Sequence, residues 1–423
     1  MLDALAEVVR TGHPAAAERL WALAREHGTP VVRIAAADPL THEVTYLWRS
    51  SGPDVTAVRL RGAPVWHEDD EVLRDPDGIA GAARLHHVAG TDVWWRTYRA
   101  RGDLRATYSF VERCHGEVRD PAPDPFNPRR WPAAPSPYPP LPEFARDNEG
   151  TSYVALPDAD PDLPAVHQAA ARGALALHTV TSRVLGNRRR VWVWTPPVSA
   201  DTEALPLLLL HDGWHWTLPG ASVAQLMDHL VTTGAVPPMV VIAQESPPGG
   251  RAELACDPAF VDFLTDELLP WARDRWPVTA HAERTAIAGQ SLGGLNAAFA
   301  AHRRPDVFGA VVAQSGSFWW APSTPYGHGA GDLMRQYAEE PRPSVRFALS
   351  VGLLEGRMVG LSRHLRDVLV AGGHDVSYRE FLGGHSWLSW APDLARALPV
   401  VTAGWARATV GGALKSSDSV VSM

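Results

Sequence analysis

The fold of this chain is decided by the stretch TAIAGQSLGGLNAAFAAH, residues 285–302. Its first four residues form a short apolar run that predicts a strand, and the part after Ser291 predicts a helix. Between the two lies the pattern G-x-S-x-G, residues 289–293. A serine in this pattern, between a strand and a helix, sits on a strained turn, and its hydroxyl projects from the carboxyl edge of a parallel sheet. The stretch therefore predicts an α/β domain with Ser291 as a nucleophile.

The residues around this stretch alternate between strand and helix patterns. A hairpin is predicted first, turning at Gly186-Asn187. Further strands are expected at 206–213, 238–245, 284–290, 310–316, 346–352 and 377–384, and helices at 222–234, 259–276, 292–305, 361–373 and 391–407. Continuous apolar strands alternating with helices are typical of a mostly parallel sheet covered on both faces. We expect this domain to span 166–408, with a polar tail at 409–423.

The N-terminal part has a different pattern. Residues 1–29 read as one or two amphipathic helices. From 30 onward, β-branched and aromatic segments alternate with Gly, Pro and polar turns, which predicts a small β-sandwich. The stretch 114–145 is so rich in proline that we expect an extended linker there. The predicted sandwich domain, linker included, spans 30–145, and a second boundary candidate lies at 155–165.

Composition excludes several classes of protein. The chain has 423 residues, which at roughly 100–200 residues per domain suggests two or three domains. Its net charge of −8 argues against a nucleic-acid binder. No apolar run reaches the ~18 residues of a membrane-spanning helix, and the N-terminus does not resemble a secretory signal. Two cysteines form no disulfide framework, so we expect a reducing, cytoplasmic location and no metal site.

A serine nucleophile needs a base and an acid, and in this fold they follow in the order serine, acid, histidine. His385 stands in FLGGHSW, just after a predicted strand, and Glu355 stands in LLEGR after the preceding one. Both loops leave the sheet edge that carries Ser291. Asp375 is the main alternative acid, although it enters its strand at the opposite edge. The other possibility for Glu355 is a solvated loop residue.

A tetrahedral oxyanion also needs two N–H donors. One is expected from Leu292, directly after the nucleophile. The second is expected from Gly213 or Trp214, in the loop that follows the strand LLLL.

The chain resembles the enterochelin (enterobactin) esterase family, the Fes-type branch of the esterase D group of α/β-hydrolases. In the second domain, the resemblance rests on LLLLHDGWHW, GGRAELACDPAFVDFLTDELLPW, GQSLGGL, QSGSFWW and FLGGHSW. In the first domain, it rests on TYLWR (45–49), GTDVWWRTYRA (90–100), LRATYSF (104–110) and DPFNP (124–128). It covers nearly the whole chain and places the family's nucleophile, histidine and acid on Ser291, His385 and Glu355.

The resemblance implies a serine carboxylic ester hydrolase that opens the ester bonds of a catecholate trilactone siderophore and releases its iron. A ferric tris-catecholate is anionic and aromatic, and it needs cationic and aromatic partners. The expected substrate-binding residues are Arg251, Trp214, Trp319, Trp320 and Trp387. Arg251 matches the family's arginine, and its alternative role is an ion pair with Glu253 or Asp257.

Several alternatives stay open at this point. The enzyme could instead act in siderophore or peptide natural-product biosynthesis, or hydrolyse feruloyl-type aryl esters. The sandwich domain is expected either to be a structural appendage or to cover the catalytic face and help bind a bulky ligand. We expect no cofactor apart from the iron in the substrate, and no nucleic-acid or membrane partner. The expected assembly is a monomer or a homodimer.

Overall fold

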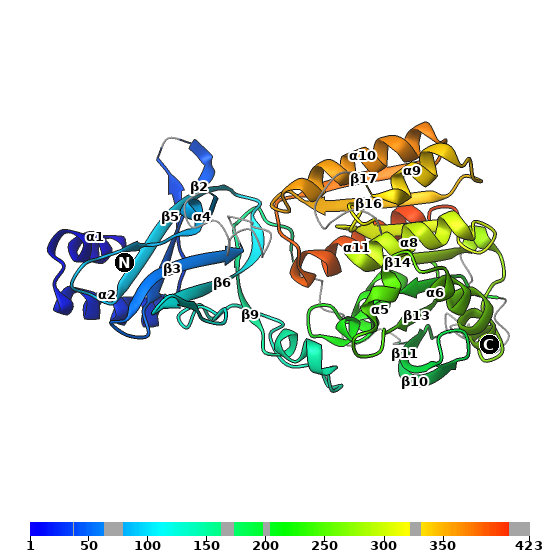
Figure 1. Cartoon of the computed structure of the whole chain (residues 1–423), viewed down its shortest axis with the longest axis horizontal. Helices are drawn as coiled ribbons and strands as arrows, with labels where there is room; N and C mark the ends of the chain where they lie inside the picture. The colour runs from blue at the N-terminus through cyan, green and yellow to red at the C-terminus, as the bar shows by residue number, and fades with distance from the viewer. Residues whose placement is uncertain (37, 63–78, 162–172, 198–203, 322–330, 406–423) are drawn as a thin grey trace, which may run out of the picture.

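The computed structural model describes residues 1–36, 38–62, 79–161, 173–197, 204–321 and 331–405. These residues form two domains that lie side by side along the longest axis of the molecule (Figure 1). The predicted tail at 409–423 lies outside the described residues. No helix in the described parts is long and apolar enough to cross a membrane.

The first domain is a β-sandwich, as its sequence predicts. One sheet has the order β1-β2-β5-β4, formed by Val31–Ala35, Asp38–Arg49, Val93–Arg101 and His86–His87. The other has the order β3-β6-β9-β8, formed by Val55–Gly62, Arg105–Cys114, Thr151–Ala155 and Arg130–Trp131, and β7 (Glu117–Val118) pairs with β6. All of these pairs are antiparallel. A short helix, α4 (Ile79–Ala83), precedes β4.

Alternation along β2 explains why the N-terminal helices belong to this domain. Tyr46 and Trp48 point into the core between the two sheets. Leu47 points the other way and packs with the apolar stripes of α1 (Leu2–Thr11) and α2 (Pro14–His27). Because both faces of the strand are covered, all three side chains are buried.

The sandwich continues past the predicted boundary at residue 145. Strand β9 pairs with β6, so the chain returns to the first domain after the proline-rich stretch. That stretch is also not simply extended, since it contributes β8 and leads into two short turns of 3-10 helix, Pro142–Phe144 and Arg146–Asn148. Proline forbids a central strand but not such an edge pair or a turn.

The second domain contains one sheet of eight strands in the order β10-β11-β13-β12-β14-β15-β16-β17. The last six of these are parallel to one another, and the hairpin β10-β11 is antiparallel, as predicted. In chain order, their bounds are Ala174–Ser182, Asn187–Thr195, Leu207–Leu210, Val240–Gln244, Thr285–Gln290, Ala310–Gln314, Arg346–Gly352 and Asp375–Phe381.

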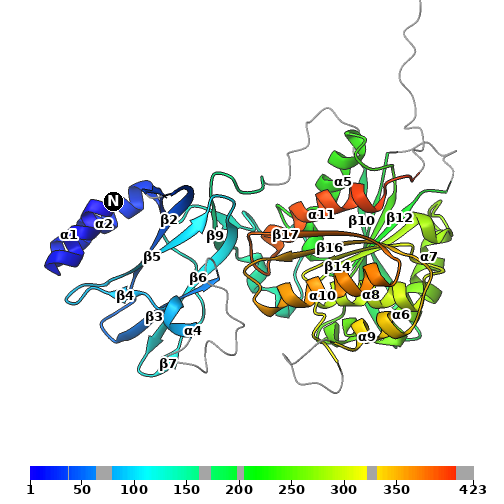
Figure 2. The ribbon, with the colours of Figure 1, turned by 90° about the horizontal axis from the view of Figure 1, so that it is seen from above.

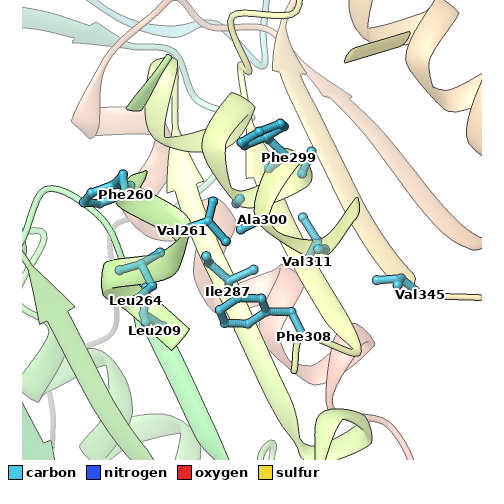
Figure 3. Packing of buried hydrophobic residues seen from close by; sticks show 14 of the residues in the cluster. Leu209, Phe260, Val261, Leu264, Ile287, Phe299, Ala300, Phe308, Val311 and Val345 are labelled. Carbon is cyan, nitrogen blue, oxygen red and sulfur yellow. The ribbon is translucent and has the colours of Figure 1, made fainter. Parts of the chain in front are cut away.

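Helices cover both faces of this sheet, as Figure 2 shows from above. One face carries α5 (Val223–Thr232) and α11 (Trp387–Val401). The other face carries α6 (Pro258–Asp262), α7 (Leu269–Arg273), α8 (Leu292–Arg303), α9 (Asp332–Glu339) and α10 (Arg357–Ala371). The sequence did not predict α9. Figure 3 shows Leu209, Ile287 and Val311 of the strands packed beneath Phe260 and Phe299.

Burial on both faces accounts for the run LLLL. Leu207 and Leu209 pack under one helical layer, and Leu208 and Leu210 pack under the other. None of the four is exposed to solvent. A continuous apolar run is therefore the expected pattern for a central parallel strand.

Candidate active site

Ser291 lies on the sharp turn that the sequence predicts between β14 and α8. Its backbone angles are φ 54 and ψ −120, in a region that non-glycine residues rarely adopt. The turn brings the strand and the helix so close that a Cβ on Gly289 would lie 2.4 Å from the carbonyl carbon of Gly293. Glycine at 289 therefore permits the crossing, and the serine is left at the carboxyl end of the strand, partly exposed.

His385 and Glu355 meet in the loops that follow β17 and β16. The Nδ1 atom of His385 lies 2.6 Å from Oε2 of Glu355. Glu355 is fully buried, and its other oxygen, Oε1, accepts hydrogen bonds from the Gly352 N–H and the Ser315 hydroxyl, both at 2.7 Å. The carboxylate is thus held by two donors on one oxygen, which leaves the second oxygen for the imidazole.

Ser315 is a member of this site that the sequence analysis missed. It follows β15 with φ 48, and its hydroxyl donates to Glu355 while accepting from the indole N–H of Trp390 at 2.9 Å. Trp390 also packs edge-on against the His385 ring, with centroids 4.7 Å apart. The only signal in the sequence was a second serine loop at the same sheet edge, QSGS.

Asp375, the alternative acid, lies far from this group in the fold. It opens β17, whereas His385 follows the end of that strand. Its carboxylate pairs with Arg346 at 3.1 Å, at the start of the neighbouring strand. Asp375 is therefore an exposed residue of the opposite sheet edge.

The structure distinguishes between Gly213 and Trp214, the two candidates for the second oxyanion donor. The Gly213 N–H donates to the Gln244 carbonyl at 2.9 Å, which continues the hydrogen bonding toward β13 and removes Gly213 as a donor. The backbone hydrogen bonds of the described loops include none from the N–H of Trp214 or of Leu292. Leu292 is the first residue of α8, where the N–H groups have no partner within the helix. Trp214 and Leu292 therefore remain the candidates.

The side chain of Trp214 is not on the surface. It is fully buried, its ring lies parallel to that of Phe144 with centroids 6.0 Å apart, and its indole N–H donates to the Tyr138 carbonyl at 3.0 Å. This burial corrects the expectation that the Trp214 side chain binds substrate. An apolar ring followed by a short 3-10 turn, residues 215–217, is drawn into the core instead of facing the loop surface.

The other predicted tryptophans keep part of their surface. Trp319 and Trp320 follow Ser317 in the loop after β15 and are half-buried. Trp387 is also half-buried, and it stacks on His215 with ring centroids 4.8 Å apart and an interplanar angle of 4°. These three rings retain some surface near the loops that hold Ser291 and His385.

Arg251 lies in the short 3-10 turn Gly250–Leu254 after β13. Its guanidinium pairs with Asp212 at 3.3 Å and lies over the Phe144 ring, 5.6 Å from the centroid. Glu253, which the sequence offered as an ion-pair partner, instead pairs with Arg189 at 2.9 Å. Arg251 therefore sits beside the loop that supplies the Trp214 N–H, with about a third of its side chain exposed (35%).

A buried histidine supports the same loop from below. His211 is completely buried, its Nδ1 contacts the Gln244 amide nitrogen at 2.9 Å, and its carbonyl accepts from the Trp216 indole at 3.0 Å. Burial lowers its pKa to about 4. The imidazole is therefore neutral at physiological pH and takes a structural role.

Metal ligands are not gathered at this site. In the part of the chain that the structure describes, no group of three or more His, Cys, Asp or Glu side chains could hold a metal ion.

Two family models match the chain. Residues 43–165 match the N-terminal domain of enterochelin esterase, and residues 182–401 match the putative esterase family.

Individual relatives match over most of their length. The iron(III) enterobactin esterase of Dickeya dadantii is 30% identical, over 88% of this chain and 90% of that protein. The iron(III) salmochelin esterase of Escherichia coli is 28% identical, over 92% of this chain and 94% of that protein. A crystal structure of the enterobactin esterase from Shigella flexneri, in the presence of 2,3-dihydroxy-N-benzoyl-serine, superposes with a TM-score of 0.66. It is 25% identical and covers 91% of this chain and 98% of the other.

Proposed function

The chain belongs to the enterochelin esterase family, and we propose from this premise that it hydrolyses the ester bonds of a ferric catecholate trilactone siderophore. The observation that carries the proposal is the arrangement at one sheet edge. A serine on a strained turn stands in the same set of loops as a histidine bound to a buried carboxylate at 2.6 Å. That arrangement has the parts of a serine esterase.

In the proposed mechanism, the Ser291 hydroxyl attacks the ester carbonyl and its proton passes to His385. The oxyanion is held by the N–H groups of Leu292 and Trp214. Collapse of the tetrahedral intermediate breaks the carbonyl–oxygen bond, and the departing alcohol takes the proton from His385. A water molecule then gives a proton to His385 and attacks the carbonyl of the acyl-enzyme. The bond from this carbonyl to the Ser291 oxygen breaks, His385 returns the proton to that oxygen, and the acid is released.

Glu355 has a separate task in these steps. Its Oε2 accepts a hydrogen bond from the Nδ1–H of His385, which leaves Nε2 as the basic atom that can face Ser291. It also stabilises the imidazolium that forms in each step. Ser315 and the Gly352 N–H hold the carboxylate in the orientation that this task requires.

We assign substrate contacts to Arg251, Trp319, Trp320 and Trp387. A ferric tris-catecholate carries negative charge and aromatic rings, so a guanidinium and indole faces beside the nucleophile suit it. The iron arrives in the substrate, held by its catechols. The enzyme itself needs no cofactor in this proposal, and it acts in the cytoplasm, as a monomer or a homodimer.

The test compares ferric enterobactin with p-nitrophenyl acetate and methyl ferulate, with products identified by mass. Wild-type enzyme is expected to open the siderophore to its linear and monomeric products, at a kcat/KM well above that for the two small esters. Ser291→Ala is expected to lose roughly 10³-fold or more in kcat, because it removes the hydroxyl that forms the acyl-enzyme. A higher kcat/KM on methyl ferulate, or near-normal turnover by Ser291→Ala, would refute the proposal.

A further inference from the structure

The loops that carry the acid and the base reach into the core of the first domain. Leu354, the residue before Glu355, packs against the aromatic core between the two sheets of the sandwich. Leu382, in the loop that leads to His385, packs against the same core. Both side chains are partly buried there. The first domain thus holds the two loops whose side chains form the acid–base pair.

Backbone contacts reinforce this docking. The Arg105 N–H, at the start of β6, donates to the Leu382 carbonyl at 3.0 Å. Gly383 approaches the same strand so closely that a Cβ there would lie 2.9 Å from the Arg105 carbonyl oxygen. The two catalytic loops are also bonded to each other, because the Leu354 N–H donates to the Gly383 carbonyl at 3.1 Å. A shift of β6 would therefore move both loops together.

Charged groups close the outer rim of this contact. Asp160, at the end of the first domain, accepts from Arg379 of β17 at 2.5 Å and from Arg396 of α11 at 2.8 Å. Arg379 also donates to Asp393 at 2.8 Å, and Asp393 is a buried residue of α11. The Arg105 guanidinium donates to the Asp160 carbonyl at 2.9 Å. The rim therefore ties the strand before His385 and the helix after it to the first domain.

The position of β17 shows why such support is needed. Among the residues that the structure describes, it is the last strand of the eight-stranded sheet. The loop that follows it has the loop of a neighbouring strand on one side only, and segments with fewer packed contacts open more readily. The first domain lies beyond the carboxyl end of this strand, with β6 and β9 on its near side (Figures 1 and 2).

We propose that the first domain is a positioning element for the acid–base pair, acting through Leu354, Leu382 and the start of β6 on the loops of Glu355 and His385. This inference rests on the proposed roles of Glu355 and His385. It differs from a role in substrate binding, because it predicts that kcat falls for every ester, including small ones that do not reach the first domain. A misplacement of about 1 Å at the reacting groups can cost 10²-fold in rate.

The experiment uses the full chain with Leu354→Ala and Leu382→Ala, and Leu85→Ala as the matched control. Leu85 belongs to the same core of the first domain and is 2% exposed, and its backbone N–H donates to the Val58 carbonyl of β3. p-Nitrophenyl acetate reports the catalytic groups alone, since it is too small to span the domains. The measurements are kcat, KM, the pH profile of kcat, the melting temperature, and the rate of Ser291 labelling by a fluorophosphonate.

We expect the two loop variants to lose roughly 10- to 100-fold in kcat on p-nitrophenyl acetate with little change in KM, and to label more slowly. We expect their pH profile to shift, because the carboxylate no longer meets the imidazole in the same geometry. Leu382→Met is expected to restore most of the rate, since it refills the same space. Leu85→Ala is expected to lower the melting temperature while folded enzyme keeps its kcat.

Two results would overturn the inference. One is a loop variant that melts lower but keeps kcat and its pH profile, which would make the contact structural only. The other is a loop variant that raises KM for ferric enterobactin and leaves p-nitrophenyl acetate unaffected, which would make the first domain a binding surface. Failure of the proposed function is distinct from both, because it would appear in wild-type enzyme or in Ser291→Ala.

Discussion

Replacing Glu355 by glutamine tests the acid at the level of single hydrogen bonds. The Oε1 atom of Glu355 accepts from two donors, the Gly352 N–H and the Ser315 hydroxyl. A glutamine of the same shape must place its carbonyl oxygen there, because its amide nitrogen would meet the Gly352 N–H, a donor that cannot reverse. The amide nitrogen is thereby forced into the Oε2 position, facing Nδ1 of His385.

The consequence for the imidazole follows directly. An amide N–H at that position donates to Nδ1, so the proton of neutral His385 moves to Nε2. That tautomer cannot accept the Ser291 proton, and the imidazolium loses its counter-charge. The same inversion in serine hydrolases of other folds costs about 10⁴-fold in kcat, and we expect a loss of about 10³- to 10⁴-fold here.

The assay is kcat on p-nitrophenyl acetate and on ferric enterobactin, with melting temperature measured alongside. The melting temperature should change little, since glutamine is isosteric and keeps both bonds to its oxygen. Asp375→Asn serves as the control, because that carboxylate is exposed and pairs with Arg346 at the opposite edge of the sheet. A Glu355→Gln enzyme within about tenfold of wild type, or a larger loss in Asp375→Asn, would refute the reasoning.

Three further predictions follow from other groups. Arg251→Ala should raise KM for ferric enterobactin by about tenfold and spare p-nitrophenyl acetate, an effect that weakens with added salt; equal losses on both would instead assign Arg251 to supporting the Trp214 loop. The pKa of His211 is about 4 in the folded protein, below its unfolded value of ~6.5, so the wild type loses stability as pH falls from ~6.5 toward 4. By pH 5 this loss is about 2 kcal/mol of unfolding free energy. His211→Gln should remove it and so make stability less dependent on pH. The measurement is the free energy of unfolding from urea melts at pH ~6.5 and pH 5, with the exposed His364→Gln as the control. If the His211 variant loses as much stability between the two pH values as the wild type does, His211 is not the titrating group. Asp160→Asn should lower the melting temperature and make kcat less sensitive to salt than in the wild type. A variant with the melting temperature and salt response of the wild type would show that the ion pairs of Asp160 do not stabilise the domain contact.

The sequence was informative wherever the pattern is local. The order of strands and helices in the second domain follows from apolar runs such as LLLL and from the alternation with amphipathic segments. The catalytic candidates follow from a rule of topology, since the carboxyl ends of parallel strands meet at one edge. Ser291 and His385 stand directly after predicted strands and Glu355 stands three residues after one, and the structure places all three in loops at that edge.

Features that depend on contacts between residues far apart in the sequence could not be predicted from local patterns. Strand β9 has only five residues and is a strand because β6 lies beside it. Trp214 looked like a surface aromatic in a loop, yet its ring is buried by Phe144 from the proline-rich segment. Gly213 and Trp214 could not be told apart as donors until the bond from Gly213 to β13 was seen.

The same distinction explains why the role of the first domain was left open by the sequence. Asp160 and Arg379 are separated by 219 positions, and no local pattern relates them. Leu354, directly before Glu355, and Leu382, three residues before His385, are ordinary apolar residues. Only the fold shows that each such leucine points into the sandwich while its catalytic neighbour points toward Ser315 or Trp390.

An edge strand imposes a physical requirement on any active site built beside it. In the centre of a sheet, loops are flanked by neighbours on both sides, as the Ser291 turn is by the loops after β12 and β15. A base that follows the edge strand lacks one of those neighbours, and the entropy of a half-supported loop opposes a fixed hydrogen bond between two side chains. The first domain, which packs against the loop that follows the edge strand, supplies the missing neighbour. The separate second domain is therefore expected to keep the Ser291 turn but to label slowly with a fluorophosphonate. Adding the first domain in trans is expected to speed labelling in proportion to its occupancy. Labelling of the separate domain at the wild-type rate would show that the edge loops hold their geometry unaided.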